Sequence, residues 1–226
     1  MAIQNFDNIN ILKRHSMPYE KYFGDMELSQ KQKKHRIDTA LILEDIIAVI
    51  LMLIQNEAEV GVISPVLIKQ QMIFDLLGPI ENGNFFDSEE QLDRYITNIT
   101  DEIVDSTIKN LEKYPNDYDY TGETNYWVSE DRAEFIAENE ANTLCNNKDY
   151  LDAKAQGKTR KIWMAFPDDR VRPTHVEANG SEVPIDDYFS VGGARMLYPR
   201  DTSSKYSTAS SYPEEVISCR CQCKYV

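Results

Sequence analysis

Hydrophobic residues recur at helical spacing through the first part of the chain. Between residues 32 and 56 the pattern predicts one long helix, whose second half, IIAVILMLI, is apolar on every side. We therefore expect that half to be buried as a central core helix. Ser64 followed by Pro65 is typical of a helix start. The helix that begins there is predicted to end at Leu77, because Gly78-Pro79 follows.

Two more helices follow from the same periodicity. Ser88 and Gln91 have the spacing of a capping box. A helix from there to about Lys113 is predicted by one apolar stripe, which consists of Leu92, Ile96, Ile99 and Ile103. Ser129 is a typical helix cap with acidic residues directly behind it, and the helix it starts has a narrow apolar face of mostly small residues.

The pattern changes after Gly157 to the alternation of β-strands. In KIWMAF, residues 161–166, this alternation places Trp163 on one face and its neighbours Ile162 and Met164 on the other. Further short strands are predicted at residues 188–191, 195–198 and 216–224.

Together these elements predict an α+β protein with two parts. Residues 1–128 form a helical part, in which residues 1–30 show no period and are expected to be an irregular arm. Residues 114–128 are rich in Pro, Gly, Asp and Tyr and are predicted to be a linker. Residues 129–226 form a small C-terminal α+β module with a short sheet.

The acidic residues are concentrated in the helical part. Residues 158–226 carry 10 Lys and Arg against 9 Asp and Glu, whereas the rest of the chain carries 14 against 29. This distribution argues against a general coat on nucleic acid or on an anionic membrane. The longest apolar run, residues 46–54, is too short to cross a bilayer. The sequence shows no signal-peptide pattern, and its 4 cysteines are not arranged as in secreted disulfide-bonded proteins. We therefore expect the protein to be in a reducing cytosol.

The segment DDRVRPTH gathers charged side chains in one predicted loop. Pro173 ends the preceding strand, so the loop presents two carboxylates, two guanidiniums and an imidazole: Asp168, Asp169, Arg170, Arg172 and His175. Two interpretations stay open. The loop closes on itself through ion pairs, or it contributes to a chemical site.

The motif Cys219-Arg220-Cys221 bears on that choice. On a flat strand the two cysteine Cα atoms are roughly 6.6 Å apart, whereas thiolates that share a zinc ion lie within about 4 Å of each other. A zinc site of His175, Cys219, Cys221 and Asp169 therefore requires a bend; the alternative is that the cysteines are small buried residues. Arg220 is expected to pair with Asp168 or Asp169 and so to tie the last strand to the first.

The motifs of the C-terminal part stand in a fixed order: RAEFIAENEANTLCN, KIWMAFPDDRVRPTH, VPIDDYFSVGG, MLYPRD and EEVISCRC. This order, over about residues 129–223, resembles the C-terminal module of phage head morphogenesis proteins, the minor head proteins similar to protein F of phage Mu. The residues that carry the resemblance are Glu140, Trp163, Asp168, Asp169, Arg170, Arg172, His175, Phe189, Tyr198, Pro199, Asp201, Cys219, Arg220 and Cys221. Two positions depart from the family pattern: Glu138-Asn139-Glu140 stands in place of Arg-Thr-Glu, and Arg200 replaces a common glycine after Tyr-Pro.

The resemblance implies a minor head protein of a tailed phage or prophage. Such a protein is made in the bacterial cytoplasm, lies inside the procapsid and virion, and associates with the portal and with scaffold or major capsid protein. Some members bind phage DNA, but the acidity of this chain ranks a protein partner above DNA. No small-molecule substrate, membrane or cofactor other than the hypothetical zinc is expected, and no residue is assigned as catalytic.

The competing class is an enzyme, and the sequence does not favour it. One enzyme to consider is an ADP-ribosyltransferase-like toxin, because modules similar to this C-terminal part are also found joined to ADP-ribosyltransferase domains. In this chain, however, Glu138-x-Glu140 precedes the Ser/Thr-rich stretch 202–211, which is the wrong order for that enzyme. A metal-dependent hydrolase or nuclease is the other enzyme to consider, and it rests on the His, Asp and Cys residues alone.

Overall fold

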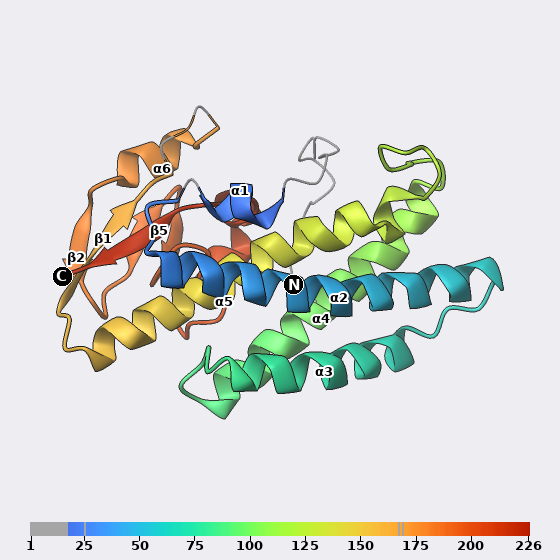
Figure 1. Cartoon of the computed structure of the whole chain (residues 1–226), viewed down its shortest axis with the longest axis horizontal. Coiled ribbons are helices and arrows are strands. Elements are labelled where there is room, and N and C mark those ends of the chain that lie inside the picture. The colour runs from blue at the N-terminus through green and yellow to red at the C-terminus, as the bar shows by residue number, and fades with distance from the viewer. Residues whose placement is uncertain (1–17, 25, 167, 169) are drawn as a thin grey trace. The chain divides into compact units, whose positions relative to one another are not determined.

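The computed structural model describes residues 18–24, 26–166, 168 and 170–226 (Figure 1). Contacts divide the chain into two compact units. With the gaps at residues 25, 167 and 169, the helical unit is described over residues 18–83 and 92–141, and the C-terminal unit over 84–91 and 142–226. We expected a division near residue 128, but the contacts place it inside the helix α5 (Glu130–Ala155).

The helical unit consists of long helices whose starts follow the sequence. Its elements are α1 (Tyr19–Gly24), α2 (Gln30–Glu59), α3 (Pro65–Asn82), most of α4 (Glu89–Lys113), η2 (Tyr126–Val128) and the first half of α5. Ser29 and Gln32 form a capping box that starts α2. The predicted helices are confirmed, with differences at their ends. Among the described residues, no helix combines the length and apolar character that a membrane span requires.

The predicted end of α3 is wrong, because the helix continues through Gly78-Pro79 to Asn82. Proline removes one backbone hydrogen bond from the helix. The continuation buries Ile80, at 1% exposure, on the face that also carries Met72 and Leu76. Gly78 does not have the positive φ that commonly ends helices. Burial of the added turn therefore offsets the lost hydrogen bond.

The expectation that the second half of α2 is fully buried is also wrong. One face packs in the core through residues such as Leu43, Ile47 and Ile54, but Val49 and Met52 are 45% and 50% exposed. The segment expected to be irregular contains α1, in which Tyr22 and Phe23 are buried. The part of that segment before residue 18 lies outside the described residues.

The C-terminal unit combines the second half of α5 with short strands and helices. These are β1 (Arg160–Met164), α6 (Pro173–Ala178), β2 (Glu182–Pro184), β3 (Phe189–Val191), β4 (Ala194–Met196), η3 (Ala209–Ser211), α7 (Pro213–Val216) and β5 (Gln222–Tyr225). Within the described residues, an antiparallel sheet has the order β2-β1-β5 (Figure 1), and β3 pairs with β4. The mainly helical first part and the small mixed second part confirm the predicted fold class.

The strand predicted over residues 216–224 is wrong in its first half. The chain there ends α7 at Val216, turns at Ser218 with φ 56°, and becomes a strand only at Gln222. A left-handed φ on a non-glycine residue is uncommon and breaks strand geometry. The two cysteines of the Cys-x-Cys motif therefore precede β5 rather than lying within it.

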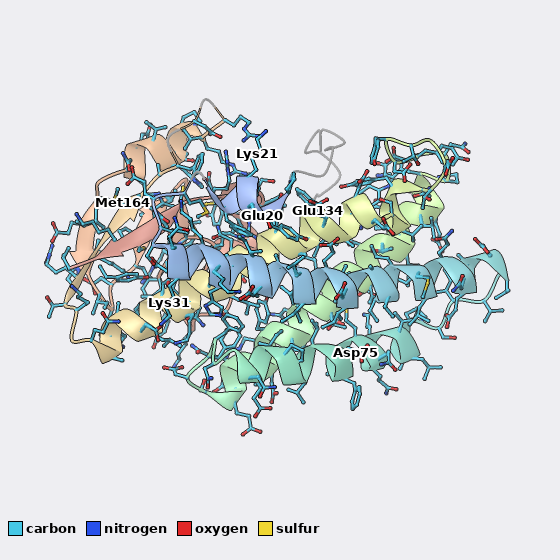
Figure 2. The ribbon with its side chains drawn as sticks, in the orientation of Figure 1. Glu20, Lys21, Lys31, Asp75, Glu134 and Met164 are labelled. Atoms are coloured by element: carbon cyan, nitrogen blue, oxygen red, sulfur yellow. The ribbon has the colours of Figure 1, made fainter. Side chains whose placement is uncertain are left out.

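The alternation predicted for β1 is confirmed, and its buried face is the one with Trp163. Trp163 and Lys161 are both 0% exposed, whereas Ile162 and Met164, the latter labelled in Figure 2, are partly exposed. Lys161 Nζ donates to the carbonyl of Ile185 at 2.6 Å, which satisfies this buried cation. The core around the indole consists of Trp163, Ala178, Phe189, Val191, Ala194, Met196, Ala209, Val216, Cys219 and Cys221.

Candidate functional site

The structure brings the predicted histidine and the two cysteines of the Cys-x-Cys motif together in the C-terminal unit. His175 Nδ1 lies 3.2 Å from Cys221 Sγ and 3.7 Å from Cys219 Sγ. The three side chains offer ligand atoms that lie within 4.8 Å of one another. Their exposed fractions are 1%, 2% and 1% for His175, Cys219 and Cys221. We call these three residues the His-Cys-Cys cluster.

The turn at Ser218 brings the thiols of Cys219 and Cys221 close to His175 Nδ1. Because residues 219–221 are not part of a strand, the separation expected for a flat strand does not apply. Two asparagines one turn apart on α5 hold this segment. Asn142 Nδ2 donates to the carbonyl of Cys219 at 3.0 Å, and Asn146 Nδ2 to that of Cys221 at 3.3 Å. Sequence reasoning missed both, although buried amides spaced four residues apart on one helix face are a recognisable signal.

Glu215, on α7, is a further residue that the sequence did not reveal. Its Oε2 lies 2.9 Å from His175 Nε2 and accepts a hydrogen bond from Thr174 Oγ1 at 2.7 Å. The side chain is 5% exposed, so a carboxylate is buried directly behind the imidazole. Gly192, with φ 56°, makes room for it, because a Cβ there would overlap the Glu215 carboxylate. This contact explains why glycine stands at position 192, the first glycine of the sequence VGG.

The cluster has a defined proton distribution. Burial opposes ionisation of Cys219, but hydrogen bonds with Cys221 and His175 outweigh it and hold the pKa of the Cys219 thiol well below its usual value. The hydrogen bond with Cys219, together with burial, raises the pKa of the Cys221 thiol. Burial also disfavours protonation of His175, yet its bond to Cys219 raises the histidine pKa overall. These directions favour one thiolate beside an imidazolium.

The charged loop is held by an ion pair to the Cys-x-Cys segment. The guanidinium of Arg220 pairs with Asp168 Oδ2, as predicted, and lies 3.7 Å from the centroid of the Phe166 ring. Arg170 reaches the same oxygen at 3.2 Å from a more exposed position. Arg172 turns away from the acids and donates to the carbonyl of Ile217. Asp169, proposed from the sequence as a metal ligand, lies outside the described residues.

Comparison with known proteins gives the family. Residues 90–224 match the family model of the Phage Mu protein F like proteins. The chain belongs to this family. The match begins close to the start of α4, earlier than the residue 129 at which the resemblance was placed. Membership indicates a protein of phage head morphogenesis.

One curated relative of this Mu F-like protein is an NAD(+)--arginine ADP-ribosyltransferase, EFV, of Enterococcus faecalis strain ATCC 700802 / V583. The two are 32% identical over 105 residues, which cover 42% of this chain and 20% of the relative. The chain thus spans one fifth of the length of that transferase. No solved structure matches the chain.

In this Mu F-like protein the Tyr-Pro-Arg-Asp motif shapes the backbone beside the cluster. Asn146 Nδ2 donates to the carbonyl of Pro199 at 3.0 Å, and the ring of Tyr198 packs 5.7 Å from that of Tyr150. Asp201 is 0% exposed and accepts the backbone N–H of Leu197 at 2.8 Å. Burial raises the pKa of Asp201 despite this bond. The motif is therefore structural.

The backbone at Arg200 has a conformation that suits glycine, the residue that the family resemblance leads us to expect after Tyr-Pro. Its φ is 67°, in the left-handed region that glycine adopts without strain. The arginine compensates through its side chain: Nε donates to Thr143 Oγ1 at 2.9 Å and Nη1 donates to the carbonyl of Val216. Both groups and the guanidinium are buried in the C-terminal unit.

Arg200→Ala and Arg200→Gly separate these two effects. Both variants lose the guanidinium bonds, but only alanine retains the left-handed strain. We expect Arg200→Ala to be less stable than Arg200→Gly by about 1 kcal/mol, measured by urea denaturation. Equal stabilities would contradict the backbone explanation.

Two further residues of the family motifs, Phe189 and Glu140, are not part of the His-Cys-Cys cluster. Phe189 packs its ring 5.3 Å from that of Trp163 in the core of the C-terminal unit. Glu140 belongs to the helical unit, where it accepts a hydrogen bond from the hydroxyl of Tyr95 at 2.8 Å. The glutamate kept from the family's helix motif thus has a packing partner of its own in this Mu F-like protein.

Proposed function

We propose that this protein is a minor head protein that attaches to the portal while the head is assembled. Its membership of the Mu F-like family supports a role in the head, and the apolar surface of its helical unit supports attachment to another protein. On this proposal it is made in the host cytoplasm and ends inside the procapsid and virion.

The helix α3 is apolar on two opposite faces. Its buried face carries Ile68, Met72, Leu76 and Ile80. Successive helical residues are rotated by about 100°, so a second set of apolar residues projects from the other side. That set, between 37% and 77% exposed, consists of Val66, Leu67, Ile73, Phe74 and Leu77. Figure 2 shows the side chains of α3, with Asp75 labelled.

The neighbouring helix α2, which packs against α3, repeats this arrangement. Leu41, Ile42, Val49 and Met52 are 45–50% exposed and follow one another at helical spacing on the side opposite its core face. Single exposed apolar residues are ordinary, whereas sets on two adjacent helices are typical of protein–protein contact surfaces. We call the exposed residues of α2 and α3 the apolar surface.

A protein partner fits this surface better than DNA does. The helical part of the chain contains most of the acidic excess, and phosphates would be repelled by it. The portal is the partner that the family resemblance implies, and scaffold and major capsid protein are the alternatives that the test must separate.

The test is co-sedimentation of the chain with purified portal, scaffold and capsid assemblies. Wild-type protein is expected to sediment with portal, and Phe74→Asp to weaken this at least about tenfold, since a charge in an apolar contact is strongly unfavourable. Thr97→Asp, at an exposed position of α4, adds the same charge outside the apolar surface and should bind normally. Sedimentation with scaffold or capsid alone, or procapsids without the protein, would defeat the proposal.

The transferase relative favours a second candidate, transfer of ADP-ribose from NAD. Only one fifth of that relative is covered, and Glu138 and Glu140 lie on the helix α5 ahead of the Ser/Thr-rich stretch. A hydrolase site at the His-Cys-Cys cluster is disfavoured because its side chains are at most 2% exposed to a substrate. An NAD-consumption assay with the purified chain distinguishes the transferase from the head protein.

A further inference from the structure

The His-Cys-Cys cluster has the spacing of ligands around one metal ion. Zinc binds sulfur at about 2.3 Å and imidazole nitrogen at about 2.0–2.1 Å, so tetrahedral ligands lie roughly 3.5–4 Å apart. His175 Nδ1 is 3.2 Å and 3.7 Å from the two sulfurs, and all three atoms lie within 4.8 Å of one another. Small adjustments of the side chains would place all three at bonding distance of a common point.

The donor types favour zinc over harder cations. Thiolate sulfur and imidazole nitrogen are the ligands of structural zinc sites, whereas magnesium and calcium take oxygen. A histidine that binds a metal through one nitrogen commonly presents the other to a carboxylate. Glu215 Oε2 lies 2.9 Å from His175 Nε2, close enough for such a hydrogen bond once the side chains reorient, and Gly192 leaves space for it.

The burial of the cluster gives a metal an electrostatic role. Two adjacent thiolates in a protein interior are costly without a compensating charge, and a divalent cation neutralises both. All four cysteines are described and none of them is in a disulfide, so the thiols of Cys219 and Cys221 are available as ligands. The backbone of the two cluster cysteines is held by Asn142 and Asn146, so the sulfurs are positioned before any ion binds.

We propose that His175, Cys219 and Cys221 bind one zinc ion that ties α6 to the segment before β5, with Glu215 orienting the imidazole. The ligands are closed to solvent, which favours a structural role, and three of them leave the fourth position of a tetrahedral zinc to a water molecule. Zinc stabilises the C-terminal unit by joining segments that are far apart in the sequence. Glu215 is not a ligand on this proposal and does not replace Asp169, the fourth ligand predicted from the sequence. This proposal does not depend on the partner of the protein.

The full chain, produced in zinc-supplemented culture and dialysed, is analysed for metal. About one zinc per chain is expected, since buried structural sites retain their ion. Cys219→Ser and Cys221→Ser are expected to lose most of it. Cys145→Ser and Cys223→Ser are matched controls, because both thiols belong to the C-terminal unit and lie outside the cluster. These controls should keep their zinc.

Cobalt substitution tests the ligands even where a serine variant folds poorly. Co²⁺ added to metal-free wild-type protein should give thiolate-to-cobalt charge-transfer bands and the ligand-field bands of a tetrahedral site. The cluster variants should lack both, and the control variants should show both. A chelator should lower the Tm of wild-type protein and of the controls.

Three results would overturn the proposal. One is wild-type protein whose zinc content does not exceed that of Cys219→Ser. Another is equal loss of zinc in the Cys145→Ser and Cys223→Ser controls. The third is a Cys219–Cys221 disulfide in freshly purified protein, found by mass spectrometry after alkylation.

Discussion

Replacing Trp163 by alanine should lower the free energy of unfolding of the C-terminal unit by about 3–5 kcal/mol, as large-to-small substitutions of buried aromatic residues do. The indole is 0% exposed. Its ring meets those of His175 and Phe189 edge to face at 5.7 Å and 5.3 Å. Alanine would leave a cavity between β1, α6 and β3 that these elements can close only by moving.

Urea denaturation followed by circular dichroism measures this loss. Trp163→Phe is the matched variant, because it fills most of the volume and should cost less than half as much. The chain has 2 tryptophans, so in both variants Trp127 alone reports by fluorescence on the helical unit. A loss below about 1 kcal/mol for alanine would show that the core is not built on Trp163.

Arg220→Ala is expected to lower the free energy of unfolding by about 2–3 kcal/mol, toward the lower end of what breaking a buried ion pair costs. The arginine side chain is 8% exposed and that of Asp168 is 21% exposed, so water only partly replaces the lost partner. The stacking of the guanidinium on Phe166 is lost as well.

Arg170→Ala provides the matched comparison, since Arg170 contacts the same carboxylate oxygen of Asp168 with its side chain 54% exposed. Exposed ion pairs contribute at most about 1 kcal/mol, so this variant should melt within a few degrees of wild type. Similar losses for the two arginines in a thermal melt would mean that burial does not decide the strength of these pairs.

The helices could be predicted from the sequence because their signals are local. Capping residues and apolar stripes depend on neighbours within one or two turns, so α2, α4 and α5 were found close to their observed bounds. The errors in the end of α3 and in the burial of α2 arose because burial depends on tertiary contacts, which the sequence does not show. Ile80 extends α3 past a proline, and an apolar run in α2 predicted full burial although Val49 and Met52 of that run are exposed.

The candidate site was predictable in its composition and not in its geometry. His175, Cys219 and Cys221 were grouped, together with Asp169, from their residue types. Arg220 was expected to pair with Asp168 or Asp169, and it pairs with Asp168. The left-handed turn at Ser218 could not be foreseen, because serine gives no signal for a positive φ. Glu215 was also missed, since its position depends on that turn and on the space left by Gly192.

The division of the chain inside α5 has a consequence for the order of synthesis. The described residues of the helical unit end at Ala141, so this unit can complete its fold while later residues are still being made. The C-terminal unit instead needs residues 84–91, where the carbonyl of Phe85 accepts from Asn147 at 2.7 Å, and its final strand, β5. Its core therefore closes only after translation has passed β5.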